Sequence, residues 1–162
     1  MPARPTKPDL ADEVWRDLAK GSFAVLAHLT DEGDPRSSGV VYGMVDRRLY
    51  VAVAPDSWKA RALGTGDEVS VTVPVRRGGL LSLLFPIPPA TISFHARVTV
   101  HSAESITRSS FPKELRRLLP DTGSPICILE LTPEGQFLTY GVGVSLADMR
   151  KPAIAAGHVP TA

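Results

Sequence analysis

The sequence predicts a mainly β protein with a few peripheral helices, in which antiparallel strands form a closed barrel or a sandwich. Alternating apolar and polar residues recur in about six or seven short segments, as in half-buried strands. Tight turns join most of these segments, which favours antiparallel pairing over crossover connections. The length of 162 residues, of which 43% are hydrophobic, fits one domain, residues 1–162, with a single core.

The chain opens with an arm and a helix. Residues 1–8 contain three of the prolines and are expected to form a loose N-terminal arm. Asp9 can cap the first turn of the helix that follows, and Gly21 suits its left-handed end. The apolar residues between them fall on one helical face: Leu10, Val14, Trp15 and Leu18. We therefore predict a helix from Asp9 to Gly21.

Strands dominate the rest of the chain. Those predicted in the first half are 23–30, 38–45, 48–54 and 68–75, with a short helix at 57–63 before the last of them. The clearest alternation is at 91–100, whose expected core residues are Ile92, Phe94, Ala96, Val98 and Val100. The second half is expected to hold a surface helix at 112–119 and strands at 126–131 and 136–144 around a turn at 132–135. The tail, 147–162, is expected to form a short helix and an irregular end.

Composition excludes several classes of function. Lys and Arg number 18 against 17 Asp and Glu, so no basic stripe favours a nucleic-acid partner. No apolar run approaches the ~18 residues that span a bilayer, so no stable membrane insertion is expected. The N-terminus has no apolar signal region, and we therefore expect a cytoplasmic protein. The single cysteine, Cys127, lies in an apolar run and is expected to be a small core residue rather than a catalytic thiol.

Familiar catalytic and metal-binding signatures are missing from the sequence. It contains no G-x-S-x-G elbow, Walker loop or H-E-x-x-H motif. His95 and His101 lie on one strand about 20 Å apart, at ~3.3 Å per residue, and cannot share an ion. His95 also shares a strand face with Arg97, which is either a ligand-facing pair or part of a polar outer face of the barrel.

The segment 49–63 carries the main functional signal. A strand ends in a turn, and a helix then opens with Asp56 or Ser57 at its cap and Lys59 in its first turn. The opening turn of a helix has unpaired N–H groups and a positive dipole end, which attract anions. Two interpretations remain open from these residues: an anion site around Lys59, or a solvated lysine on a surface helix.

These residues resemble a known family. The segments 23–30, 36–40, 49–51 and 57–63 are similar, in that order, to the FMN-binding split-barrel proteins related to pyridoxamine 5′-phosphate oxidase, which include deazaflavin-using relatives. The most specific part is Ser-Trp-Lys-Ala-Arg-Ala-Leu, from Ser57 to Leu63. The resemblance covers roughly residues 10–101 and implies an antiparallel split β-barrel that forms a homodimer with its cofactor sites at the subunit interface.

The resemblance also implies a site. Lys59 would bind the phosphate of FMN or of the deazaflavin coenzyme F420, and the backbone of Ser38 to Val40 would run along the ring. Many members have a threonine where this chain has Val53 and Ala54, so a phosphate-binding hydroxyl is missing here. Arg76, beyond the strand 68–75, either pairs with a phosphate or is solvated. The candidate cofactor-binding residues are Ser37, Ser38, Gly39, Val40, Val53, Ala54, Ser57, Trp58, Lys59 and Arg76.

Two functions follow from these expectations. The first is a flavin- or deazaflavin-dependent oxidoreductase that transfers hydride to or from a small organic substrate, with the chemistry supplied by the cofactor. No side chain stands out as its general acid or base. The alternative is a non-catalytic barrel that binds a cofactor or a lipophilic molecule. The apolar, proline-ended stretch 80–90 is then a lid, a pocket wall, a membrane-touching flap, a dimer contact or ordinary core.

Overall fold

The computed structural model describes residues 7–77, 79, 87–102, 111–120 and 123–162. Most of the predicted N-terminal arm, and residues 80–86 of the apolar stretch, lie outside these ranges. Within them, no helix is both long enough and apolar enough to cross a membrane.

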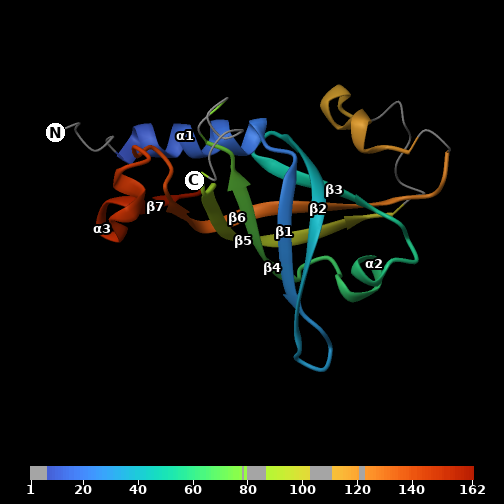
Figure 1. The fold of residues 1–162 in the computed structure, drawn as a ribbon. Helices are drawn as coiled ribbons and strands as arrows, with labels where there is room; N and C mark the ends of the chain where they lie inside the picture. The colour runs from blue at the N-terminus through green and yellow to red at the C-terminus, as the bar shows by residue number, and fades with distance from the viewer. Residues whose placement is uncertain (1–6, 78, 80–86, 103–110, 121–122) are drawn as a thin grey trace.

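In the described part of the chain, seven antiparallel strands form one sheet in the order β3-β2-β1-β4-β5-β6-β7, and β3 also pairs with β6. That pairing closes six strands into a barrel and leaves β7 attached to β6 (Figure 1). The predicted mainly β, antiparallel barrel is therefore confirmed. The strands are β1 (Phe23–Leu29), β2 (Pro35–Val45), β3 (Arg48–Val53), β4 (Glu68–Val75), β5 (Ala90–His101), β6 (Cys127–Tyr140) and β7 (Ala156–Pro160).

Helix α1 (Lys7–Lys20) packs its apolar face onto the barrel core. Val14 and Leu18 are fully buried, and the Trp15 ring meets Phe137 of β6 edge-on, with the ring centroids 4.9 Å apart. The helix begins two residues earlier than predicted, so Asp9 lies inside its first turn and not at the cap. Pro8 causes no break, because the first turn of a helix does not need its N–H group. Gly21 follows the last helical residue as expected, with its N–H donating to the Asp17 carbonyl, but its φ is not positive, so the predicted left-handed end is wrong.

The alternation at 91–100 predicted the core correctly. Ile92, Phe94, Ala96 and Val98 of β5 are buried inside the barrel, and Val100 packs against their cluster from a partly buried position. Full burial of a side chain as large as Ile92 or Phe94 contributes roughly 1.5–3 kcal/mol to the stability of the fold. Cys127 also lies against this cluster, partly buried, as a small apolar side chain would.

Two predictions for the C-terminal third were wrong. The residues 132–135 do not form a turn, because β6 runs through them without reversing. Instead, the register between β5 and β6 shifts near Ser93 and His95, and Gly135 has a φ of 75°, which bends the strand as a bulge. The tail is not irregular at its end, since β7 pairs with β6 and buries Val159 opposite Phe137.

Short helices complete the described part. They are α2 (Trp58–Ala62), η3 (Lys113–Leu118), η4 (Asp148–Arg150) and α3 (Pro152–Ala155). The surface helix predicted at 112–119 is the 3₁₀ helix η3, which buries only Leu115. A Cβ on Gly43 of β2 would lie 2.6 Å from Leu115 Cδ2, so η3 rests closely on the outer face of β2.

Candidate functional site

The helix α2 positions Lys59 as the sequence indicated. Ser57 is its N-cap, and the Ser57 hydroxyl accepts a hydrogen bond from the Ala60 N–H at 3.2 Å. Lys59 therefore extends from the first turn of the helix. Trp58 precedes it, and the Lys59 ammonium lies 5.0 Å from the centroid of the Trp58 ring, which is the distance of a cation–π contact.

Lys59 lines a cavity of about 350 Å³ between α2, η3 and the strands β2 and β3. Such a volume lies at the lower end of the range for small-molecule sites. The lining residues are Gly39, Val40, Val41, Val51, Ala52, Val53, Lys59, Arg117 and Leu118.

The cavity opens where β2 and β3 separate. Their paired register ends at Tyr42 and Val51, although β3 continues to pair with β6 as far as Val53. The Tyr42 N–H donates to Ser22 on the β1 side, so strand alternation directs the backbone groups of Gly39 toward β3. No strand in the described residues pairs with Gly39 on that side. A ligand edge in the cavity can therefore bond to this backbone.

Small residues of β2 and β3 leave space for a ligand in the cavity. Gly39 and Ala52 contribute little or no side chain to the lining, and Val41 is 59% exposed. An added Cβ on Gly39 would lie 2.8 Å from the Phe23 ring, so the glycine lets this ring pack directly on the β2 backbone. The result is a small-residue, apolar surface suited to one face of a flat ring.

The electrostatics of the cavity favour an anion. Among its lining residues, Lys59 and Arg117 carry charge and both are cations, with no carboxylate beside them. Within the described residues, neither takes part in an ion pair. The Arg117 guanidinium makes one long contact, 3.5 Å, to the Tyr42 carbonyl. Two cations beside a polar backbone edge match a phosphorylated ligand, because charge-assisted hydrogen bonds are the strong ones.

The structure brings together part of the predicted site. Gly39, Val40, Val53 and Lys59 line the cavity, and Ser57 holds the helix that carries Lys59. Ser37, Ser38 and Ala54 flank lining residues in the chain without lining it. Trp58 also lies outside the lining and stacks on His28, with the ring centroids 5.2 Å apart.

Arg76 is not brought to this cavity. It follows Val75, at the end of β4 that pairs with Ala90, whereas the opposite end of β4, at Glu68, follows α2. Arg117 lines the cavity and is not among the residues that the sequence predicted for the site. Its signal was a pair of adjacent arginines in a predicted surface helix, but nothing local showed that this helix would rest on β2 and β3.

Arg97 and His28, the remaining polar candidates, contact other residues of the protein rather than a cavity. Arg97 pairs with Glu134 at 2.8 Å and with Glu68 at 3.3 Å on the exposed face, which favours the polar outer face over a ligand site. His28 is buried, and its Nδ1 lies 2.9 Å from the Leu29 carbonyl oxygen. In the described ranges, no three His, Cys, Asp or Glu side chains gather as a metal site.

No protein-family model matches the sequence, and no curated protein matches it. Solved structures match it over most of their length. An F420 reductase is 16% identical, with 75% of this chain and 93% of that chain covered and a TM-score of 0.55. A pyridoxamine 5′-phosphate oxidase-related, FMN-binding protein from Nostoc punctiforme is 14% identical over 86% of this chain and 85% of that one, with a TM-score of 0.52.

The chain has the split-barrel fold of these proteins. HutZ, the heme storage protein from Vibrio cholerae, shares this split barrel at 16% identity, covering 83% of this chain and 96% of that chain with a TM-score of 0.60. The likeness is one of fold, since function depends on the residues grafted onto a barrel. What the split barrel of this chain binds therefore depends on the residues of its own cavity.

Proposed function

We propose that this protein binds a flavin-type cofactor, FMN or coenzyme F420, in the cavity between β2 and β3 and acts as an oxidoreductase. The observation that carries the proposal is the pair of cations, Lys59 and Arg117, in a lining without carboxylates. The bound ring would supply hydride transfer to or from a small organic substrate. Lys59 and Arg117 would hold the phosphate, while Gly39 and Ala52 would leave room for the ring.

The residues present fit such a group with one difference. Val53 lines the cavity where a hydroxyl is common in the family that the sequence resembles, so the phosphate would depend more on the two cations. The Ser57 oxygen accepts the Ala60 N–H, which leaves its own O–H able to donate, but Ser57 does not line the cavity and so does not take the place of that hydroxyl. Structural neighbours that are named as an F420 reductase and an FMN-binding protein support a cofactor of this class.

Titration of the purified protein with FMN, riboflavin and coenzyme F420, followed by fluorescence, tests the proposal. We expect FMN or coenzyme F420 to bind in the micromolar range. Lys59→Ala and Arg117→Gln should each weaken binding about tenfold or more, since a hydrogen bond to a charged group contributes about 1.5–3 kcal/mol. Riboflavin, which lacks the phosphate, should bind more weakly and be insensitive to both changes.

Each variant has a matched control on the same helix. Arg61→Ala changes an exposed cation of α2, and Arg116→Gln changes an exposed cation of η3, and neither residue lines the cavity. If the controls weaken FMN as much as Lys59→Ala and Arg117→Gln do, the binding is nonspecific. Absence of binding by all three compounds would contradict the proposal.

Binding without catalysis is a second candidate function. It is favoured by the lining itself, which, in the described residues, contains no His, Cys, Asp, Glu or Tyr able to move a proton. A neighbour named as a heme storage protein shows that this fold accommodates such a role. Anaerobic mixing of the flavin-loaded protein with NADPH distinguishes the two. Reduction faster than that of free flavin supports the oxidoreductase, and an equal or slower rate supports storage or sequestration.

We further propose that the protein is a homodimer whose interface lies beside the cavity. Phe23 and Val41 are direct cross-strand partners on β1 and β2, and they are 48% and 59% exposed. Exposed apolar side chains gathered next to a ligand site are typical of a surface that a partner covers. A second copy over this face would exclude water from the ring.

A further inference from the structure

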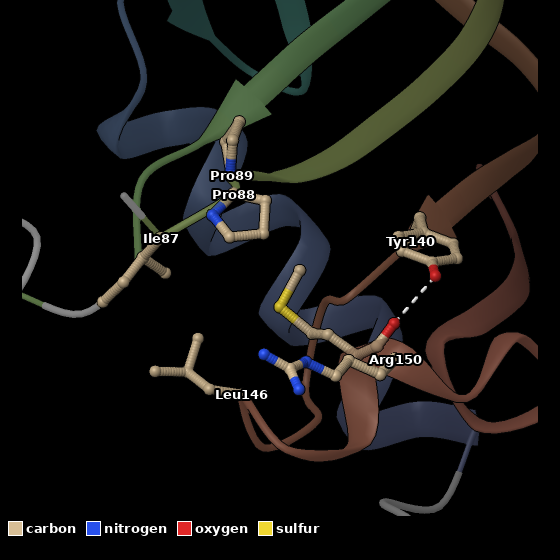
Figure 2. A pocket seen from close by; sticks show the side chains of 7 residues that line it. Ile87, Pro88, Pro89, Tyr140, Leu146 and Arg150 are labelled. Carbon is tan, nitrogen blue, oxygen red and sulfur yellow. Dashed lines mark hydrogen bonds between the residues drawn. The ribbon is translucent and has the colours of Figure 1, made fainter. Parts of the chain in front are cut away.

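A second cavity, of about 320 Å³, lies where β6 ends and η4 begins (Figure 2). It shares no residue with the cavity between β2 and β3. In Figure 1, the C-terminal elements that form it lie on the opposite side of the barrel from α2. Its lining residues are Ile87, Pro88, Pro89, Tyr140, Leu146, Met149 and Arg150.

Hydrogen bonds hold the walls of this second cavity in place. The Tyr140 hydroxyl donates to the Met149 carbonyl at 2.7 Å, which leaves the ring of Tyr140 as the surface it offers (Figure 2). The Ser145 hydroxyl donates to the Asp148 carboxylate at 2.8 Å and so fixes the turn that leads into η4. Arg77 donates to the Val144 carbonyl at 2.7 Å and ties the loop to the end of β4. The wall formed by Tyr140, Met149 and the loop before η4 is therefore preformed, as the walls of small-molecule sites usually are.

The lining combines an apolar body with one positive charge. Five of its side chains are aliphatic, proline or methionine, and Tyr140 adds an aromatic face. Arg150 is the charged member, and it forms no ion pair within the described residues. Nearby Asp148 is already held by Ser145 and by Lys151 at 3.2 Å. Among the residues that the structure describes, no carboxylate therefore occupies Arg150.

We propose that this cavity binds a small amphipathic carboxylate, with its anionic head on Arg150 and its hydrocarbon body against Ile87, Pro88 and Leu146. A guanidinium pairs a planar carboxylate through two parallel hydrogen bonds, which suits a single cation at the rim. The cavity between β2 and β3 differs in having two cations, Lys59 and Arg117, which match a phosphate. The proposal does not depend on the flavin proposal, because the two cavities share no residue.

Calorimetric titration with straight-chain carboxylates tests it. Hexanoate, octanoate and octanol would be compared on the wild-type protein. We expect octanoate to bind in the micromolar to millimolar range and more tightly than octanol. Each added methylene should improve the affinity about fourfold until the cavity is full, since burying one contributes ~0.8 kcal/mol.

Substitutions locate the binding. Arg150→Gln should weaken octanoate about tenfold and remove its advantage over octanol, Arg150→Lys should recover part of the affinity, and Leu146→Ser should weaken both ligands. Arg36→Gln is the matched control, because Arg36 is an exposed arginine of β2 outside both cavities. All of these positions except Leu146 carry polar side chains on the surface, and a thermal melt of each variant verifies the fold.

Four results would overturn the proposal. Wild-type protein that shows no saturable octanoate binding, or Arg150→Gln that binds octanoate as tightly as wild type, excludes a carboxylate at Arg150. Loss of octanoate binding in Lys59→Ala would place the ligand in the first cavity. Sedimentation that shows a wild-type dimer dissociated by Leu146→Ser would mean that a second copy of the chain covers this surface.

Discussion

Tyr42 shows how a single side chain ties a helix to the barrel. Its ring is fully buried in the core, and its hydroxyl donates to the Leu18 carbonyl near the end of α1 at 2.6 Å. Burial raises the pKa of the Tyr42 hydroxyl well above its ordinary value, because a phenolate inside the barrel would lose its hydration. Tyr42 should therefore affect both the stability of the fold and its dependence on pH.

Tyr42→Phe should lower the free energy of unfolding by about 1 kcal/mol at neutral pH, the usual net contribution of one hydrogen bond. Above the ordinary pKa of 10.0, the unfolded wild-type chain loses the Tyr42 proton while the folded chain keeps it. Wild-type stability should then fall by about 1.4 kcal/mol per pH unit until the folded pKa is reached. Urea denaturation between about pH 9 and about pH 11 measures this, and the phenylalanine variant should lack the Tyr42 share of the slope.

The comparison controls for other tyrosines. Burial, as the largest cause, also raises the pKa of Tyr50, which is unchanged in the variant and contributes equally to both proteins. The informative quantity is the difference between the two pH curves, which should shrink as the pH rises. Parallel curves would show that Tyr42 ionises as readily in the folded chain as in the unfolded one.

At the scale of elements, turn chemistry and strand pairing compete for the same residues. Asp46 and Arg47 form the two-residue loop between β2 and β3, and both adopt positive φ, 49° and 60°, although neither is the glycine that such loops favour. Residues 132–135 have the composition of a turn, yet β6 continues through them because β5 and β7 pair with it. The sequence shows only that Gly135 can adopt a positive φ, and the long-range pairing of β5 with β6 shows that the result is a bulge.

Gly135→Ala should therefore destabilise the fold by about 1–2 kcal/mol, because Gly135 has a φ of 75° and an L-residue is strained in that region. The added Cβ would also lie 3.0 Å from His95 Cε1. Gly64→Ala is the control: its Cβ would meet only Asp67 Oδ2 at 3.6 Å, and its stability should change by less than about 0.5 kcal/mol. Chemical denaturation of the two variants compares them, and equal costs would mean that the bulge does not depend on glycine.

For the whole molecule, local patterns predicted most of the strands, their antiparallel pairing and the short helix that carries Lys59. They worked because alternation and caps are properties of neighbouring residues, as with β5 and Ser57. They could not predict the contacts that shape the cavity. Arg117 reaches it because η3 rests on β2, more than 70 residues earlier in the chain, and β7 was missed because its partner Phe137 lies outside any local window.

A dimer built on β1 and β2 should couple assembly to flavin binding. Phe23 does not line the cavity but is half exposed beside it, with its ring against Gly39. Phe23→Lys would place a charge in the proposed interface, where it loses hydration without a partner. We expect sedimentation equilibrium to show a dimer dissociation constant raised at least tenfold, since one central aromatic side chain often contributes 2 kcal/mol or more.

Flavin affinity should follow the dimer. At protein concentrations where Phe23→Lys is monomeric, FMN binding should weaken, and it should recover as the concentration rises into the dimeric range, because a ligand that binds only the dimer is linked to assembly by mass action. Leu138→Lys is the matched control, since Leu138 is equally exposed, at 49%, on β6 outside the cavity. It should change neither assembly nor affinity. A wild-type protein that is monomeric with and without FMN would refute the dimer while leaving Lys59 and Arg117 to be judged by their own titrations.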